Sequence, residues 1–266
     1  MPPPSPSDRI PRPRPLRRRG LALAALGALL ALPLAVAAQQ ITVSAAASLT
    51  DAFKEIGQRF EASRPGASVR FNFAASGVLL QQIDQGAPAD VFASADQETM
   101  DRAADRKLLA AGTRRNFAGN ALVLIEPTRD AVGIGSLRAL AAPAVRRIAI
   151  GKPATVPVGR YTRAALEGAG LWAALEPKFV QADSVRQVLD YVARGEADAG
   201  FVYRTDARIM AGKVTVSLEP GGVPPVRYPV AVVQDSRQQA LAREFVDFLG
   251  SDAARQVLGR FGFDRP

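Results

Sequence analysis

The sequence predicts an α/β protein built on a mostly parallel sheet. Short apolar runs alternate with stretches in which apolar residues recur every three or four positions, and this alternation indicates strands connected by helices. Gly, Pro, Ser and Asp stand between these segments, where turns and helix caps are expected. The sequence has no internal repeat of the length found in solenoid proteins.

The first half of the chain contains three predicted strand–helix units. The first helix is expected to take Ser48 as its N-cap, and the second follows Ser76 and ends at Gly86. Asp96 is expected to cap the third helix. The three strands that precede these helices are predicted at residues 41–43, 69–73 and 89–93.

A second α/β series is predicted from residue 120 onward. Its first strand covers 120–126 and is ended by Pro127. A helix is expected over about 161–168, and Asp183 with Ser184 is expected to cap the next one, with Asp183 as the cap. The other predicted elements are strands at 147–151, 199–203 and 228–233 and two C-terminal helices, the second beginning after Ser251.

The N-terminus has the pattern of a secretory signal peptide. Residues 1–19 are rich in Pro and Arg, the next nineteen residues carry no charge, and small residues precede Gln39. A retained membrane anchor is the alternative, because the apolar stretch approaches the length of a membrane span, but Pro33 interrupts it. We therefore expect residues 1–38 to be a signal peptide that is cleaved near Ala38 on export.

The signal peptide also accounts for much of the basic charge. It holds six Arg and one Asp, so the rest of the chain has 28 basic and 24 acidic residues and a net charge of +4. No basic run remains there, which argues against nucleic-acid binding. The chain contains no Cys and no His, so disulfides, the usual zinc ligands and the Ser-His-Asp triad are excluded.

Two predicted strand-to-helix turns share one design. In each, a serine, Ser48 or Ser76, stands at a helix start behind small residues. Helix N-termini offer free backbone N–H groups and a partial positive charge, and turns at one edge of a parallel sheet converge on one pocket. A pair of ordinary N-caps is an equally good explanation of the two serines alone. The start of the helix after Asp183 offers further N–H groups of the same kind.

Other chemistries have weaker support in the sequence. Neither serine lies in a Gly-x-Ser-x-Gly elbow or a Ser-x-x-Lys motif, so a hydrolase is not expected. The acids lack calcium-loop spacing, and a ferric site at Tyr161 and Tyr203 would lack clustered carboxylates. Arg160 and Arg163 are candidates for lining an anion pocket, with exposed positions as the commoner alternative.

Five motifs follow one another along the chain. Residues 41–50 read ITVSAAASLT and residues 86–97 read GAPADVFASADQ, and three shorter motifs lie at residues 156–161, 200–203 and 228–233. Together they resemble the periplasmic molybdate-binding proteins that serve as substrate-binding subunits of ABC importers. The resemblance runs from about Gln40 to the C-terminus.

This resemblance implies a type II periplasmic-binding-protein fold, in which two α/β lobes are joined by two crossing hinge strands. Lobe I would comprise 39–120 and 207–266, and lobe II would comprise 121–206. The crossings would lie near 120–122 and 203–207. The resemblance further implies a periplasmic, monomeric receptor that is not an enzyme, needs no cofactor and docks on a membrane permease.

The resemblance also implies the binding site. The family's two serine hydroxyls fall on Ser48 and Ser76, its two main-chain amide donors on Val158 and Val185, and its tyrosine hydroxyl on Tyr203. The metal of the anion would be held only through its oxygens. Molybdate carries no proton at neutral pH, so hydrogen-bond donors suit it, whereas an acidic side chain would repel it.

The expected function is therefore binding of molybdate, with tungstate as a second ligand, and delivery to an ABC permease. Two alternatives remain open on the sequence. One is a receptor for sulfate or another tetrahedral oxyanion, since the sequence does not give the pocket radius. The other is an anion sensor without a role in transport.

Overall fold

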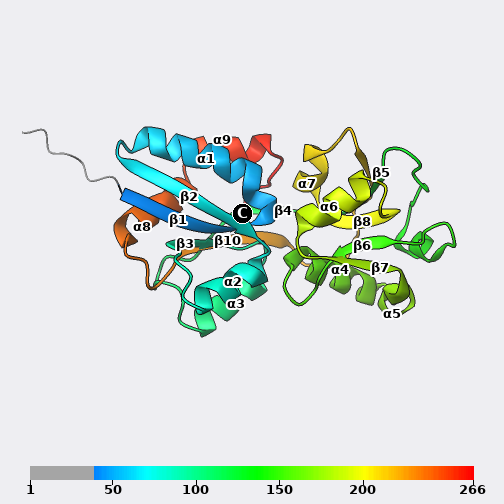
Figure 1. Ribbon diagram of the computed structural model, residues 1–266. Helices are drawn as coiled ribbons and strands as arrows, with labels where there is room; N and C mark the ends of the chain where they lie inside the picture. The colour runs from blue at the N-terminus through cyan, green and yellow to red at the C-terminus, as the bar shows by residue number, and fades with distance from the viewer. Residues whose placement is uncertain (1–38) are drawn as a thin grey trace, which may run out of the picture. The chain divides into compact units, whose positions relative to one another are not determined.

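The computed structural model describes residues 39–266, which form one compact unit. The predicted signal peptide, residues 1–38, lies outside the described residues. The described part contains two five-stranded sheets, each with helices packed against it (Figure 1). Strands and helices alternate along most of the chain, which confirms the predicted α/β class and the two-lobed fold. The prediction of a mostly parallel sheet is wrong, because both sheets contain antiparallel as well as parallel pairs.

The first sheet has the strand order β2-β1-β3-β10-β4. Strand β1 runs parallel to β2 and β3, whereas β10 is antiparallel to β3 and β4. The strands are β1 (Gln39–Ala46), β2 (Ala67–Ala74), β3 (Val91–Ala93), β4 (Arg115–Asn120) and β10 (Val226–Val232). Its helices are α1 (Thr50–Ser63), α2 (Ser76–Asp84), α3 (Gln97–Asp105), α8 (Gln239–Phe248) and α9 (Asp252–Arg260).

The second sheet has the order β7-β6-β8-β5-β9, with β6 parallel to β7 and β8 and with β5 antiparallel to β8 and β9. Its strands are β5 (Leu122–Pro127), β6 (Ile148–Gly151), β7 (Phe179–Ala182), β8 (Ala199–Tyr203) and β9 (Val214–Leu218). Its helices are α4 (Pro157–Gly168), α5 (Trp172–Leu175), α6 (Val185–Ala193) and α7 (Arg204–Ile209). Three short 3-10 helices, η2 (Ala47–Leu49), η3 (Leu137–Ala141) and η4 (Glu176–Lys178), complete the described elements.

The chain passes between the sheets at two places. The first passage lies between β4 and β5, around Ala121, where the resemblance implied it. The second lies between β9 and β10, at residues 219–225, and not at 203–207. Strand β9 pairs with β5 and so belongs to the second sheet, although the expected boundary assigned 207–266 to lobe I. Strand β9 forms the backbone hydrogen bonds on the side of β5 that β8 does not occupy. The chain therefore returns to the first sheet only after β9, later in the sequence than expected.

Aromatic residues form the centre of the core under the first sheet. Phe53 and Phe60 of α1 meet Phe245 of α8, and the Phe60 and Phe245 rings stand edge to face with centroids 5.2 Å apart. All three side chains are fully buried. Burying each contributes about 1.5–3 kcal/mol to folding, so these helices are held firmly on the sheet that carries the first predicted serine.

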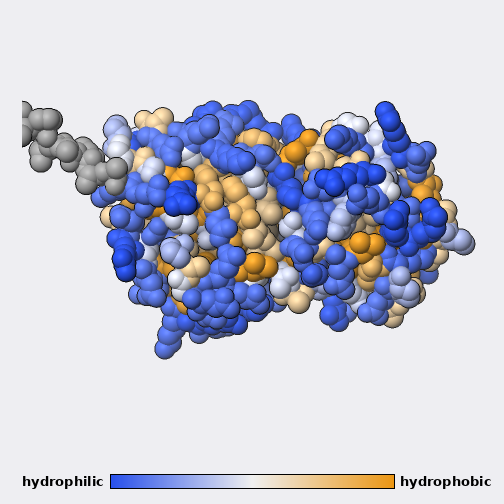
Figure 2. All heavy atoms as spheres, in the orientation of Figure 1, coloured by the Kyte–Doolittle hydropathy of each residue, from blue (hydrophilic) through white to orange (hydrophobic). Residues whose placement is uncertain are grey.

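Strand β2 is an edge strand of the first sheet and is only partly covered. Figure 2 shows a mostly hydrophilic face with apolar side chains gathered over this strand. On β2, Val69, Phe71 and Phe73 are partly buried and pack against the core, and the last two rings are stacked with centroids 5.2 Å apart. No helix of residues 39–266 is both long enough and apolar enough to cross a membrane.

Candidate anion-binding site

A small cavity lies where strand ends of both sheets meet helix starts. It encloses about 10 Å³. The structure brings all five predicted site residues together in its wall. The lining consists of Ala46, Ala47, Ser48, Ala75, Ser76, Ala95, Val156, Pro157, Val158, Val185 and Tyr203. Small residues precede each serine in this wall, as the sequence predicted.

Ser48 does not cap a helix, which corrects the N-cap expectation. It lies in the 3-10 turn η2, and the N-cap position of α1 is Leu49, which makes no side-chain cap. The Ser48 hydroxyl is buried and lies 3.1 Å from the hydroxyl of Tyr228 on β10. The Ser48 hydroxyl is therefore held by a residue of β10 and does not cap a helix.

A hydrogen-bonded chain supports Ser48 through Tyr228. The side-chain amide of Asn120 donates one proton to the Tyr228 hydroxyl (3.2 Å) and the other to the Thr205 hydroxyl (2.9 Å). Tyr228 thus accepts from Asn120, and either hydroxyl can be the donor in the bond between Tyr228 and Ser48. When Tyr228 is the donor, the proton of Ser48 is available for a ligand in the cavity.

Ser76 is likewise held by a hydrogen bond from another segment of the chain. It is the first residue of α2, whose N-cap position is Ala75, so this serine is not an N-cap either. Its hydroxyl oxygen accepts a hydrogen bond from the backbone N–H of Ala95 (3.1 Å), and the residue is fully buried. Because its oxygen is already engaged, the hydroxyl proton is free to donate into the cavity.

The second lobe offers backbone amides. Val158 is the second residue of α4, which begins at Pro157 and not near Tyr161 as expected. Val185 is the first residue of α6, whose N-cap is Ser184 and not Asp183. Initial N–H groups of a helix have no partner within it. Among the described residues, neither valine N–H donates to the backbone outside its helix, so both remain available at positive helix ends.

Tyr203 ends β8 and closes the cavity wall. Its hydroxyl donates to the Ala95 carbonyl over 3.4 Å, a long hydrogen bond that a better acceptor could replace. Burial, reinforced by the neighbouring Tyr228 and Tyr161, raises the pKa of Tyr203 well above its usual value. The phenol therefore stays protonated and acts as a donor at neutral pH.

Within residues 39–266, no side chain that lines the cavity is charged. Arg160 lies nearby but donates to Asp96 from Nε (2.8 Å) and from Nη2 (2.5 Å), and its Nη2 also donates to the Thr99 hydroxyl. Asp96 also caps α3, as predicted, by accepting from the Thr99 N–H. The exposed Arg163 pairs with Glu167. Both arginine candidates are thus engaged outside the cavity.

Direct contacts join the two lobes beside the cavity. The Gly77 N–H donates to the Thr155 carbonyl (2.9 Å), and the Arg160–Asp96 ion pair links α4 to the start of α3. Position 77 has to be glycine, because a Cβ there would lie 2.6 Å from the Thr155 oxygen. The lobes therefore meet with very little clearance at this point.

Sequence reasoning missed three residues that support the site. Ala95 lies in a third small-residue turn like the other two, and this likeness is the signal in the sequence that points to it. Asn120 and Tyr228 are 108 residues apart, so no local pattern could have paired them. In the described part of the chain, no three His, Cys, Asp or Glu residues cluster as metal ligands would.

Comparisons with known proteins agree with this geometry. A family model of bacterial extracellular solute-binding proteins matches residues 41–264. The molybdate-binding protein ModA of Escherichia coli K12 is 39% identical over 229 residues, which cover 84% of this chain and 88% of that protein. A structural match is found with the Azotobacter vinelandii periplasmic molybdate-binding protein, with a TM-score of 0.73 and 26% sequence identity. The match covers 85% of this chain and 99% of the Azotobacter chain.

The fold by itself does not distinguish between oxyanions. The sulfate-binding protein SubI of Mycobacterium tuberculosis matches with a TM-score of 0.74, over 85% of this chain and 87% of that one, but at 19% identity. That likeness concerns the fold alone, whereas the ModA relatives match in sequence as well. The chain belongs to the bacterial extracellular solute-binding protein family, within the group of the ModA molybdate-binding proteins.

Proposed function

We propose that this protein is an extracytoplasmic receptor that binds molybdate, and tungstate in the same way, and delivers it to an ABC permease. The ligand is held by the hydroxyls of Ser48, Ser76 and Tyr203 and by the backbone amides of Val158 and Val185. The names of the relatives support the choice of ligand, and the predicted export signal supports a periplasmic location.

The observation that carries the proposal is the chemistry of the cavity wall. Every polar side chain in it is a hydroxyl, and Tyr228 and the Ala95 N–H hold the hydroxyls of Ser48 and Ser76 in hydrogen bonds in which each serine oxygen can accept and keep its proton for the ligand. A fully deprotonated dianion needs donors only, and helix starts stabilise its charge without a paired cation. A protonated anion such as hydrogen phosphate would need an acceptor that this wall lacks among its side chains.

Binding requires the two lobes to move. A cavity of about 10 Å³ is near the space of a single water molecule, which is too small for a tetrahedral oxyanion. The donors come from both lobes, so parting them admits the anion and closing them completes its shell of donors. We propose that a monomer in the closed form docks on the permease.

Calorimetric titration of the mature chain tests the ligand. Molybdate and tungstate should bind tightly, and sulfate and phosphate should bind far more weakly. Tight sulfate binding with weak molybdate binding would instead identify a sulfate receptor and overturn the proposal.

Molybdate uptake by cells that lack the protein tests delivery. Uptake from low concentrations should fall when the chain is removed and recover when it is restored. Unchanged uptake would favour an anion sensor that does not serve transport.

A further inference from the structure

Arg186 follows the proposed ligand residue Val185 and reaches across to the other lobe. Its Nη2 lies 2.8 Å from an Asp51 carboxylate oxygen at the start of α1, and 3.5 Å from the carbonyl oxygen of Ser48. Its Nε lies 2.9 Å from a carboxylate oxygen of Asp206 on α7. One guanidinium therefore joins the segment that carries Ser48 to the segment that carries Val185.

The charges around Arg186 do not balance. Two carboxylates, from Asp51 and Asp206, share a single cation, so the cluster has a net charge of −1 when all three are ionised. Asp206 is fully buried. In the described part of the chain, both of its carboxylate oxygens lack an aligned hydrogen bond, as do Arg186 Nε and the facing oxygen of Asp51. A buried, incompletely paired carboxylate is costly.

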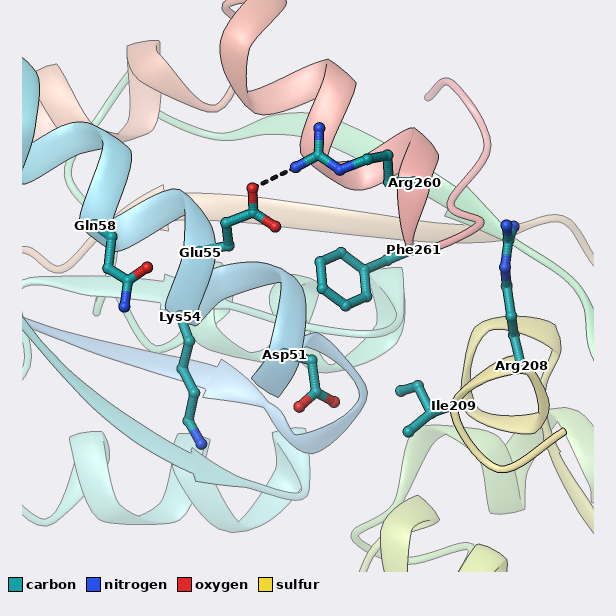
Figure 3. Close-up of a pocket in the computed structure, with 8 residues that line it drawn as sticks. All are labelled: Asp51, Lys54, Glu55, Gln58, Arg208, Ile209, Arg260 and Phe261. Carbon is teal, nitrogen blue, oxygen red and sulfur yellow. Dashed lines mark hydrogen bonds and ion pairs between the residues drawn. The ribbon is translucent and has the colours of Figure 1, made fainter. Parts of the chain in front are cut away.

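Among residues 39–266, Arg186 is the only cation that forms an ion pair with Asp206. Arg186 faces it from α6 and Asp51 from α1, while the tyrosines of β8 and β10, Tyr203 and Tyr228, stay neutral because burial raises the pKa of each. On its own helix, Arg204 pairs with Asp264 and Glu219, and Arg208 lies in the groove that Figure 3 shows.

Burial raises the pKa of Asp206 to about 6, even though Arg186 and the nearby backbone of Tyr203 favour the ionised form, and Asp51 adds to the rise. Helix α7 packs on α6 and on strands of the second sheet, so Asp206 and Arg186 belong to the same lobe. Closure brings up Asp51 from the other lobe, excludes water and places a dianion beside Ser48 and Val185. All three changes favour a protonated Asp206.

The rim of the cluster is open to solvent. Asp51 lies at the edge of a groove of about 800 Å³ between α1, α7 and the end of α9, lined also by Lys54, Arg208 and Phe261 (Figure 3). The Asp51 side chain is 38% exposed, whereas that of Asp206 is fully buried. A proton can therefore reach the cluster through this groove when the lobes part.

We propose that Arg186 is a positioning residue that aligns the two lobes on the anion, and that Asp206 takes up a proton as they close. This inference rests on the proposed function, because closure on a dianion supplies part of the driving force. The bound state then holds the proton more tightly than the free state. By linkage, affinity for the dianion rises as the pH falls through the range in which Asp206 titrates.

Calorimetry in paired buffers tests proton uptake. The wild-type chain is titrated with molybdate near pH 6 in two buffers of different ionisation enthalpy, and again near pH 8. We expect the binding enthalpy to depend on the buffer near pH 6, with uptake of a substantial fraction of one proton, and not near pH 8. Buffer-independent enthalpy at both pH values, with molybdate still bound, would overturn this inference and leave the proposed function intact.

Two variants assign the proton to its residue. Asp206→Asn should abolish the uptake near pH 6. Asp183→Asn is the matched control, because this acid is in the same lobe but exposed and paired with Lys152, and it should leave the uptake unchanged. Uptake that persists in Asp206→Asn would overturn the assignment. Failure of the wild type to bind molybdate at all would overturn the proposed function and this inference together.

Substitutions of Arg186 test the positioning role. Arg186→Gln should weaken molybdate binding at least about tenfold, since it removes charge-assisted contacts across the lobes. Arg186→Lys should recover part of the loss because it retains the charge. Both variants should keep the wild-type circular dichroism spectrum. Equal affinity in Arg186→Gln and wild type would show that Arg186 does not align the site.

Discussion

The hydroxyl of Tyr228 lies 3.1 Å from that of Ser48, and the donor to Tyr228 is the Asn120 side-chain amide. These residues come from β10, from the turn after β1 and from the end of β4. The bond therefore ties the proposed anion donor to β10, the strand at which the chain returns to the first sheet. When Tyr228 is the donor in this bond, the Ser48 proton is free for the ligand, and this makes the pair testable.

Tyr228→Phe should weaken molybdate binding without changing the fold. The substitution removes the hydroxyl that holds Ser48 through a neutral hydrogen bond of about 0.5–1.5 kcal/mol, so the Kd should rise about 2- to 12-fold. Calorimetry measures the effect. Tyr191→Phe is the control, because the Tyr191 hydroxyl accepts from Gln187 on the same helix and does not line the cavity, and this variant should bind like the wild type.

Ser48→Ala and Ser76→Ala should each cost one hydrogen bond to a charged ligand. That loss is about 1.5–3 kcal/mol, or about 10- to 150-fold in Kd for each substitution. Ser251→Ala is the control, since Ser251 caps α9 away from the cavity. This variant should lower the free energy of unfolding by about 1 kcal/mol and should not change the affinity for molybdate. A Ser48→Ala/Ser76→Ala double variant with wild-type affinity would show that the anion binds elsewhere.

Local patterns predicted the part of the fold that depends on neighbouring residues. Strand β8 was placed at its observed bounds, and the turns before Ser48 and Ser76 were recognised as a pair. Strand β9 was missed because two of its five residues are exposed and its place is decided by pairing with β5. The antiparallel insertion of β10 is likewise a long-range arrangement that periodicity does not reveal.

The candidate site shows the same division. Serine side chains behind small residues form a readable pattern, so Ser48 and Ser76 could be chosen from the residues. A backbone amide leaves no such trace, and Val158 and Val185 were reached only through the family resemblance. Asp206 gave no signal either, because its burial depends on the packing of α7 against α6 and on Asp51 from the other lobe.

Gly77→Ala should impair closure. The added methyl group would lie 2.6 Å from the Thr155 oxygen and 2.8 Å from its Cα, both on the opposite lobe. Such overpacking costs about 1–3 kcal/mol, so affinity for molybdate should fall about 5- to 150-fold. Small-angle X-ray scattering with saturating molybdate should show a larger radius of gyration than the wild type. Gly168→Ala, where a Cβ meets nothing within 4 Å, should change neither quantity.

Glu126→Gln should lower stability and flatten its dependence on acid pH. Glu126 is 2% exposed and accepts from the N–H groups of Gly133 and Ile134 and from the Ser217 hydroxyl. Burial alone would raise the pKa of Glu126, but these hydrogen bonds outweigh it and hold the pKa below its usual value. A carboxylate of this kind stabilises the fold above its unfolded-state pKa, and the contribution disappears as the pH falls through the lower folded-state value.

The amide of the Glu126→Gln variant can accept from only one of the two backbone N–H groups and opposes the other. We expect a loss of about 1–3 kcal/mol in the free energy of unfolding at neutral pH, and a smaller difference from the wild type in acid. Urea unfolding near pH 7 and again near pH 4 measures both. Glu196→Gln, which removes an exposed carboxylate 4.0 Å from Arg194, should match the wild type at both pH values. If the free energy of unfolding of Glu126→Gln differed from that of the wild type by the same amount at pH 7 and at pH 4, the charge of Glu126 would not be the feature that holds the loop at 133–134.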